Sequence, residues 1–134
     1  MTETKQRYIE GIGRRKTAVA RVRITPNAKD SLLINDKELN AYFVTTELQN
    51  IVKSALTVGS AGEKYTVTVH VNGGGIHAQA EAVRHGLSRT LVERDGTVRE
   101  ALKKLGFHKR DSRQVERKKF GLKKARKAPT WSKR

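Results

Sequence analysis

Positive charge is concentrated at one end of this 134-residue chain, and that concentration limits how much of the chain can fold. The last 32 residues, Lys103 to Arg134, hold 14 of the 29 basic side chains but only 2 of the 13 acidic ones. This segment therefore carries +12 of the formal net charge of +16. Like charges repel in a compact state, whereas a polyanion neutralises them and releases its own counterions. We therefore expect an extended segment whose partner is nucleic acid.

The rest of the chain is long enough for one domain. We expect residues 1–106 to form a globular α+β body and residues 107–134 to form a basic C-terminal arm. About 100 residues can bury one modest core. Aromatic side chains make up only 5% of the residues, so this core should be aliphatic. Because the periodic apolar positions precede the arm, the body should fold without it.

The composition argues against several classes of protein. The chain has no cysteine, which excludes disulfides and thiolate metal sites. No apolar run approaches the roughly 20 residues that a membrane-spanning helix needs. The polar start of the chain, residues 1–6, is unlike a secretory signal. We therefore expect a cytoplasmic protein with no membrane partner.

Alternation of apolar residues predicts three strands. Residues 17–25 place alternate side chains on one face, and residues 65–72 repeat the pattern with β-branched residues almost throughout. A shorter apolar strand is expected at residues 32–34. The inward-facing positions of the two longer strands should be Ala18, Ala20, Val22 and Ile24 in the first, and Tyr65, Val67, Val69 and Val71 in the second.

Apolar residues at helical intervals predict three helices. The first begins near Thr46, with Thr45 or Thr46 as its N-cap. The second follows residue 75, with a buried stripe, and the third opens with a capping box at residues 97–100 and ends at Gly106. The stripe of the second helix should be Ile76, Ala80, Val83, Leu87 and Leu91, and the third should bury Val98, Ala101, Leu102 and Leu105.

This order of elements predicts the fold class. Strand, strand, helix, strand, helix and helix is typical of an α+β two-layer sandwich. We expect a mostly antiparallel or mixed four-stranded sheet with its helices on one face, and the extended basic arm beyond it.

Three cations beside two glycines precede the first predicted strand. Residues 11–16 read Gly-Ile-Gly followed by Arg14, Arg15 and Lys16. A tight loop of this kind presents cations to a phosphate backbone, and its glycines allow that backbone to come close. The alternative is an ordinary hairpin with a basic tip. Cations continue into the strand as Arg21 and Arg23, which favours RNA contact.

A run of three glycines, Gly73, Gly74 and Gly75, connects the second long strand to a helix. Phosphate-binding loops occupy such positions, because amides at a helix N-terminus favour an anion. The run lacks the glycine-lysine-serine or threonine signature of nucleotide-binding loops, and no carboxylate pair for magnesium lies beside it. We interpret the run as a structural turn, with an RNA phosphate as an alternative occupant.

Nothing in the sequence indicates catalysis or a cofactor. The four histidines have no metal-ligand spacing, and each is expected at the surface or facing RNA. Glu81 and Glu93 are expected on a solvated helix face. No paired acids or nucleophile set suggests itself, so we predict no metal, no cofactor and no enzyme activity.

The predicted arm combines cations with widely spaced apolar residues. Val115, Phe120, Leu122 and Trp131 are interleaved with the basic residues, which suits stacking on bases. A disordered tail that only adds solubility would carry charge of both signs. An amphipathic membrane helix would need more large hydrophobic residues than Gly121 and Pro129 leave room for. Nucleic acid is therefore favoured.

Several motifs together resemble one family, the ninth protein of the small ribosomal subunit, in its bacterial or organellar form. The matching stretches are residues 13–22, 71–75, 79–86 without residue 81, 110–119, 124–129 and 132–134. They follow the family's order along almost the whole chain. One departure is Ala78, where the family usually has glycine.

The resemblance implies a body bound to the head of the small subunit and an arm that reaches the peptidyl-tRNA site. There Lys133 and Arg134 would contact the anticodon stem-loop of the tRNA, and neighbouring head proteins would be further partners. The residues that we expect to bind ribosomal RNA are Arg14, Arg15, Lys16, Arg21, Arg23, Arg110, Arg113, Arg117, Lys118, Lys119, Lys123, Lys124, Arg126 and Lys127. A histone-like or double-stranded-RNA binder outside ribosomes, and a metabolic enzyme using the glycine turn, remain alternatives.

Overall fold

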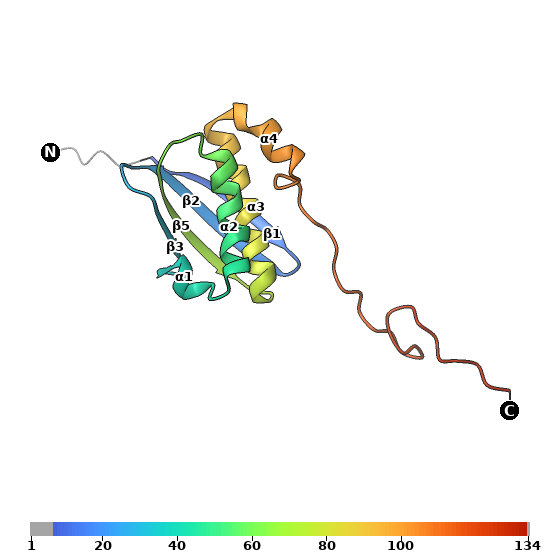
Figure 1. The fold of residues 1–134 in the computed structure, drawn as a ribbon. Coiled ribbons are helices and arrows are strands. Elements are labelled where there is room, and N and C mark those ends of the chain that lie inside the picture. The colour runs from blue at the N-terminus through green and yellow to red at the C-terminus, as the bar shows by residue number, and fades with distance from the viewer. Residues whose placement is uncertain (1–6, 134) are drawn as a thin grey trace.

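A single mixed sheet forms one layer of the structure, a computed structural model that describes residues 7–133 (Figure 1). The strand order is β1-β2-β5-β3-β4, with β3 parallel to β5 and the other neighbours antiparallel. The strands within these residues are β1 (Ile9–Arg15), β2 (Ala18–Pro26), β3 (Ser31–Ile34), β4 (Lys37–Glu38) and β5 (Tyr65–Asn72).

The helices form the second layer. The two long helices, α2 and α3, lie side by side on one face of the sheet (Figure 1). The bounds are α1 (Leu39–Tyr42), α2 (Thr46–Gly59), α3 (Ile76–Arg94), the 3-10 helix η1 (Gly96–Val98) and α4 (Arg99–Lys104). The predicted α+β class, with a mixed sheet and helices on one face, is confirmed. The sheet has five strands instead of the predicted four.

The core lies between the helices and the inward faces of β2 and β5. These strands pair antiparallel, with Val22 opposite Val69 and Ala20 opposite Val71. All eight alternating positions predicted to face inward are buried, and the cluster is almost wholly aliphatic, with Phe43 as its one fully buried phenylalanine. The other face of the sheet has no helix against it within residues 7–133 (Figure 1). Its exposed side chains include polar and basic ones.

Strand β1 corrects the expectation of a loop at residues 11–16. Ile9–Arg15 pairs along its length with β2, and the chain turns at Lys16 and Thr17. Its apolar alternation is hidden, because two of the inward positions facing α3, Gly11 and Gly13, are glycines. A Cβ atom on Gly13 would lie 1.9 Å from the carbonyl oxygen of Ala82 in α3. Because these glycines have no side chain, the backbone of α3 can lie directly against β1.

Three predicted core positions are exposed. Ile76 is 51% exposed in the first turn of α3, and Ala101 and Leu105 also face solvent. The buried side of α3 consists mainly of small residues instead, which lets the helix lie close to the sheet. Helix α4 has only six residues and buries just one of them, Leu102. The inward positions of α3 are Ala78, Ala80, Ala82, Val83, Gly86, Leu87, Ser88, Thr90 and Leu91.

The ends of the C-terminal helices are fixed by local hydrogen bonds. The predicted capping box does not form; instead the side chain of Asp95 accepts from the backbone N–H of Thr97. Gly106 ends α4 as predicted, with a φ of +76° and a backbone N–H donated to Lys103 O. Phe107 N–H donates to Leu102 O, which completes a Schellman motif.

Beyond α4 the chain leaves the body. Residues 107–133, which we call the C-terminal segment, contain no helix or strand and run outward past the β1 side of the molecule (Figure 1). Only the start of this segment contacts the body, where Phe107 packs against the core. Throughout residues 7–133, no helix has both the length and the apolar composition needed to cross a bilayer.

Substituting alanine at Gly13 should destabilise the body, because the new Cβ would overlap backbone atoms of α3 that cannot move aside. We expect a loss of about 1–3 kcal/mol in the free energy of unfolding, the usual cost of overpacking a core. Urea denaturation measures this directly. The matched control is Gly96→Ala, where the added Cβ meets nothing within 4 Å. Equal stability of the two variants would contradict the account of β1.

Shortening the chain should separate the body from the rest of the C-terminal segment. A chain ending at Arg113 should melt like the full-length protein, because it keeps the contacts of Phe107 and Asp111 with the body. One ending at Gly106 should still fold but lose about 1–2 kcal/mol, since it gives up an apolar contact and a cation–π pair. Thermal melts followed by circular dichroism compare them. If the chain that ends at Gly106 proved to be unfolded, Phe107 would be an essential part of the core.

Candidate nucleic-acid interface

The three cations of residues 14–16 have different environments at the β1–β2 turn. Arg14 and Lys16 are exposed and have no ion-pair partner within residues 7–133. Lys16 adopts a φ of 52°, an uncommon conformation that the tight turn requires. The guanidinium of Arg15 instead turns back onto the body, where its side chain is only 11% exposed. Sequence pattern alone does not distinguish these three residues.

Arg15 links the sheet, helix α3 and the start of the C-terminal segment. Its Nε donates to Glu81 Oε2 at 2.6 Å, and its Nη1 donates to the carbonyl oxygen of Arg113 at 2.7 Å. The same Nη1 lies 3.4 Å from Asp111 Oδ1. Glu81, expected on a solvated face, is therefore part of a shielded ion pair. We call the contacts of Arg15 with Glu81, Asp111 and Arg113 the Arg15 junction.

Asp111 and Arg113 close the outer side of the Arg15 junction. Arg113 donates from Nε and Nη2 to the two carboxylate oxygens, and its backbone N–H donates to Oδ1. These hydrogen bonds lower the pKa of Asp111 far below its ordinary value, so the carboxylate is ionised throughout the neutral range. The same pair raises the pKa of Arg113. Part of the charge of Arg113 is therefore balanced within the chain.

A small basic cleft lies beside this junction. Its volume is about 100 Å³, and Arg14, Arg15, Arg84 and Lys109 outnumber the acids Glu81 and Asp111 around it. The guanidinium of Arg84 stacks on the ring of Phe107, 4.6 Å from its centroid, and burial lowers the pKa of Arg84. The cleft joins the tip of the β1–β2 hairpin to residues about 90 positions later in the chain.

Histidine His85 fixes one wall of the cleft and is not a free surface residue. Its Nδ1 accepts a hydrogen bond from the backbone N–H of Arg14 at 3.2 Å. Burial, and then the positive charge of Arg89, lower the pKa of His85 below its ordinary value, which keeps Nδ1 free to accept. Burial also lowers the pKa of His108. His85 is therefore half-buried beside the basic cleft, and the expectation that it faces RNA stays a prediction.

The two arginines of β2 lie on the uncovered face of the sheet. Both contact Glu10 of β1, Arg21 at 3.1 Å and Arg23 at 2.7 Å. Arg23 also lies over the ring of Tyr8, 4.8 Å from its centroid, and the hydrogen bond to Glu10 raises its pKa. The single negative charge of Glu10 balances only one of the two guanidinium charges, so this face keeps a positive charge. The register of β1 on β2 creates this cluster.

The remaining predicted RNA-binding cations lie along the C-terminal segment and are exposed. Arg126 forms a bidentate pair with Glu116, at 2.6 and 2.9 Å. The others have no ion pair within residues 7–133, and Lys133 is exposed as well. Arg134 lies outside the described residues. The exposed cations without such a pair are Arg110, Arg117, Lys118, Lys119, Lys123, Lys124 and Lys127.

Large apolar side chains on the same segment have no cover from the protein. Val115 is 90% exposed, Phe120 100% and Trp131 81%. Exposed aromatic rings between free cations match the chemistry of single-stranded nucleic acid, in which bases stack and phosphates pair with cations. The segment therefore displays both kinds of contact group at once.

The glycine run forms the turn from β5 into α3. Gly73 and Gly74 have φ values of +74° and +64°, which favour glycine. A Cβ on Gly74 would also lie 3.0 Å from the backbone nitrogen of Ala18. Gly75 is the N-cap of α3 and has open space around it. Within the described residues, no group of three or more histidine or acidic side chains is arranged to hold a metal.

The chain matches a known protein family along most of its length. A family model described as ribosomal protein S9/S16 matches residues 13–134. The match begins inside β1 and takes in the basic cleft, the glycine turn and the C-terminal segment. Because it covers nearly the whole chain, we conclude that this protein belongs to the ribosomal protein S9/S16 family.

Proposed function

We propose that the protein is a structural constituent of the small ribosomal subunit that binds ribosomal RNA in its head and has no catalytic role. The observation that carries the proposal is the display of unpaired cations and bare aromatic rings on the C-terminal segment. Residues 114–133 hold eight basic side chains and a single acidic one. Such a segment is stable in an extended form only when phosphates neutralise it.

The body supplies a second set of RNA contacts. Arg14 and Lys109 line the basic cleft with exposed charge, and Lys16 and Arg110, their neighbours in the chain, are exposed as well. Arg21 and Arg23 add charge on the open sheet face. Phosphate contacts of this kind set the orientation of a protein on RNA without reading its sequence. Arg15 has a different role in this proposal: it positions the C-terminal segment instead of binding phosphate.

The end of the segment is proposed to contact tRNA in the peptidyl site. The family resemblance suggests this role for Lys133 and Arg134. Both cations follow Pro129 and Trp131 and can form charge-assisted hydrogen bonds with an anticodon-stem phosphate. Contacts with the backbone suit every tRNA equally.

Sedimentation separates this proposal from a nucleic-acid binder that works outside ribosomes. The full-length protein should migrate with small subunits through a sucrose gradient at moderate salt and should not accompany free double-stranded RNA or DNA of equal mass. Migration with duplex nucleic acid alone would favour the histone-like or double-stranded-RNA alternative.

Binding to small-subunit RNA should depend steeply on salt. If on the order of ten phosphates are neutralised, affinity should fall about 10³- to 10⁵-fold between 50 and 200 mM salt. Filter binding across this range gives the slope. A chain ending at Arg113 keeps the folded body and loses the nine cations of residues 114–134, so its slope should be much shallower. A flat salt dependence for the full chain would contradict counterion release.

Substituting Arg15 with lysine should free the start of the C-terminal segment. Lysine keeps the charge but cannot bond Glu81 and Arg113 together, and one charge-assisted hydrogen bond contributes roughly 1.5–3 kcal/mol. Limited trypsin digestion after Lys109, Arg110 and Arg113 should therefore be about tenfold faster. The matched control, Arg14→Lys, alters an exposed neighbour and should leave cleavage unchanged. Equal cleavage in both variants would remove the positioning role from Arg15.

Removing residues 131–134 should weaken tRNA binding in the peptidyl site while leaving assembly nearly intact. We expect a loss of roughly 1–3 kcal/mol, the range for hydrogen bonds to charged groups. The measurement is the tRNA dissociation constant on purified small subunits at low magnesium. A control with Arg126→Gln and Lys127→Gln removes two cations farther from the end and should retain tRNA affinity. Equal affinity for trimmed and intact protein would exclude a tRNA role for the end of the chain.

A further inference from the structure

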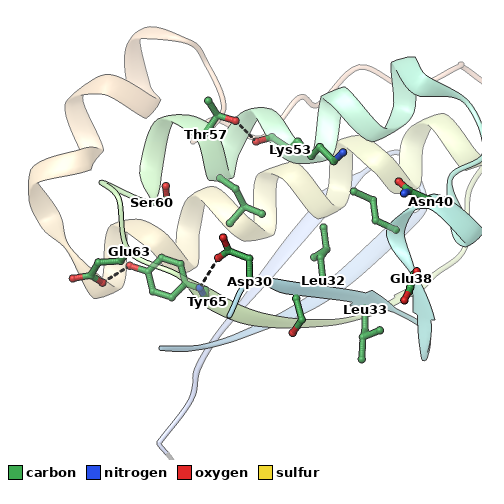
Figure 2. A pocket seen from close by; sticks show the side chains of 13 residues that line it. Asp30, Leu32, Leu33, Glu38, Asn40, Lys53, Thr57, Ser60, Glu63 and Tyr65 are labelled. Carbon is green, nitrogen blue, oxygen red and sulfur yellow. Dashed lines mark hydrogen bonds between the residues drawn. The ribbon is translucent and has the colours of Figure 1, made fainter. Parts of the chain in front are cut away.

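A groove of about 600 Å³ lies at the edge of the sheet opposite β1. Helix α2 overhangs strand β3, and the space between them runs from Glu38 and Asn40 at one end to Glu63 and Tyr65 at the other (Figure 2). Leu32 points from β3 toward α2, whereas Leu33 points to the opposite face of the sheet (Figure 2). Leu32, Leu39 and Leu56 give the groove an apolar floor.

The charge around this groove is opposite to that of the chain as a whole. Residues 30–63 contain five acidic and two basic side chains, a net charge of −3 in a chain of +16. Three of those acids, Asp30, Glu38 and Glu63, line the groove against one cation, Lys53. Repulsion of phosphate makes RNA an unsuitable occupant.

These acids differ in whether they already have hydrogen-bond or ion-pair partners within the protein. Asp30 accepts a hydrogen bond from the backbone N–H of Tyr65, and Glu63 accepts one from the Tyr65 hydroxyl (Figure 2). Glu63 also forms an ion pair with Arg94. The side chain of Glu38 is exposed and has no hydrogen-bond or ion-pair partner within residues 7–133. Because β4 ends at Glu38, this carboxylate lies at the mouth of the groove with its charge available to a cation.

The backbone at this edge is open as well. Strand β4 pairs only with Leu33 and Ile34 of β3, so the outer edge of Ser31 and Leu32 has no strand partner within residues 7–133. The inner edge of the same residues is paired with β5. An unpaired strand edge is a template for an added strand, and alternate side chains of the added strand then enter neighbouring pockets.

We propose that this groove binds an extended lysine- or arginine-rich segment of another protein, which adds a strand along the outer edge of β3. Aliphatic side chains of that segment would cover Leu32 and Leu56, and a cation would pair with Glu38. The chain's own C-terminal segment leaves on the β1 side, away from the groove (Figure 1). The proposal rests on the proposed function in one respect: the assembled small subunit is expected to supply the neighbouring protein.

Hydrogen exchange on assembled subunits tests the proposal. We compare the full-length protein free, bound to small-subunit RNA alone, and in complete subunits, following a peptide that contains Ser31 and Leu32. The outward-pointing amide there should exchange at least about tenfold more slowly in complete subunits, because a strand partner protects it. RNA alone should give no such protection.

A matched pair of substitutions tests the role of charge. Glu38→Lys changes the mouth of the groove, and Glu93→Lys makes the same change at an exposed position on α3. Both variants should sediment with small subunits. The protection should disappear in Glu38→Lys and persist in Glu93→Lys.

The outcomes distinguish this inference from the proposed function. Sedimentation without protection of residues 31–32 would overturn the inference alone. Protection by RNA alone, or by self-association of the free protein at higher concentration, would overturn it by identifying a different occupant. Failure of the unmodified protein to sediment with small subunits would overturn the proposed function, and with it this partner.

Discussion

The backbone contact between β1 and α3 determines where the functional side chains lie. A Cβ on Gly13 would lie 2.3 Å from the backbone nitrogen of Gly86, and one on Gly86 would lie 2.7 Å from Val22 Cγ2. Only the absence of both side chains lets helix and strand approach so closely. This approach brings Arg15 within reach of Glu81, and the Arg14 amide within reach of His85. The basic cleft exists because β1 and α3 lie so close together.

Arginine and lysine have different roles in this protein: several arginines form ion pairs within the chain, whereas most lysines remain exposed and unpaired within residues 7–133. Within residues 7–133, Arg15, Arg113 and Arg126 form ion pairs that hold distant segments or turns together, whereas Lys104 is the one lysine in an ion pair. The planar guanidinium bonds two acceptors at once, which suits a fixed junction, while an ammonium group remains strongly hydrated. The lysines of the C-terminal segment therefore stay available for phosphate.

Local patterns in the sequence predicted the central strands but not the contacts between distant segments. Alternation in β2 and β5 is visible because every inward position is apolar. Strand β1 was missed because glycine at two of its inward positions, Gly11 and Gly13, leaves too little alternation to detect. The Arg15 junction joins residues 66 and 98 positions away, Glu81 and Arg113, and a run of cations gives no sign of which one turns inward. The carboxylate of Glu81 lies beside Arg15 only because β1 pairs with β2 and α3 packs against β1.

In the proposed function, the Arg15 junction also limits the entropic cost of binding RNA. Ordering a flexible residue costs roughly 1–2 kcal/mol of backbone entropy. Because Asp111 and Arg113 are already held on the body, residues 107–113 contribute little to this cost, and the segment beyond them starts from a fixed point. If the body binds RNA as proposed, tethering then raises the effective concentration of the segment's cations near that RNA. In the proposed function, Glu81 therefore favours RNA binding by holding Arg15 in place.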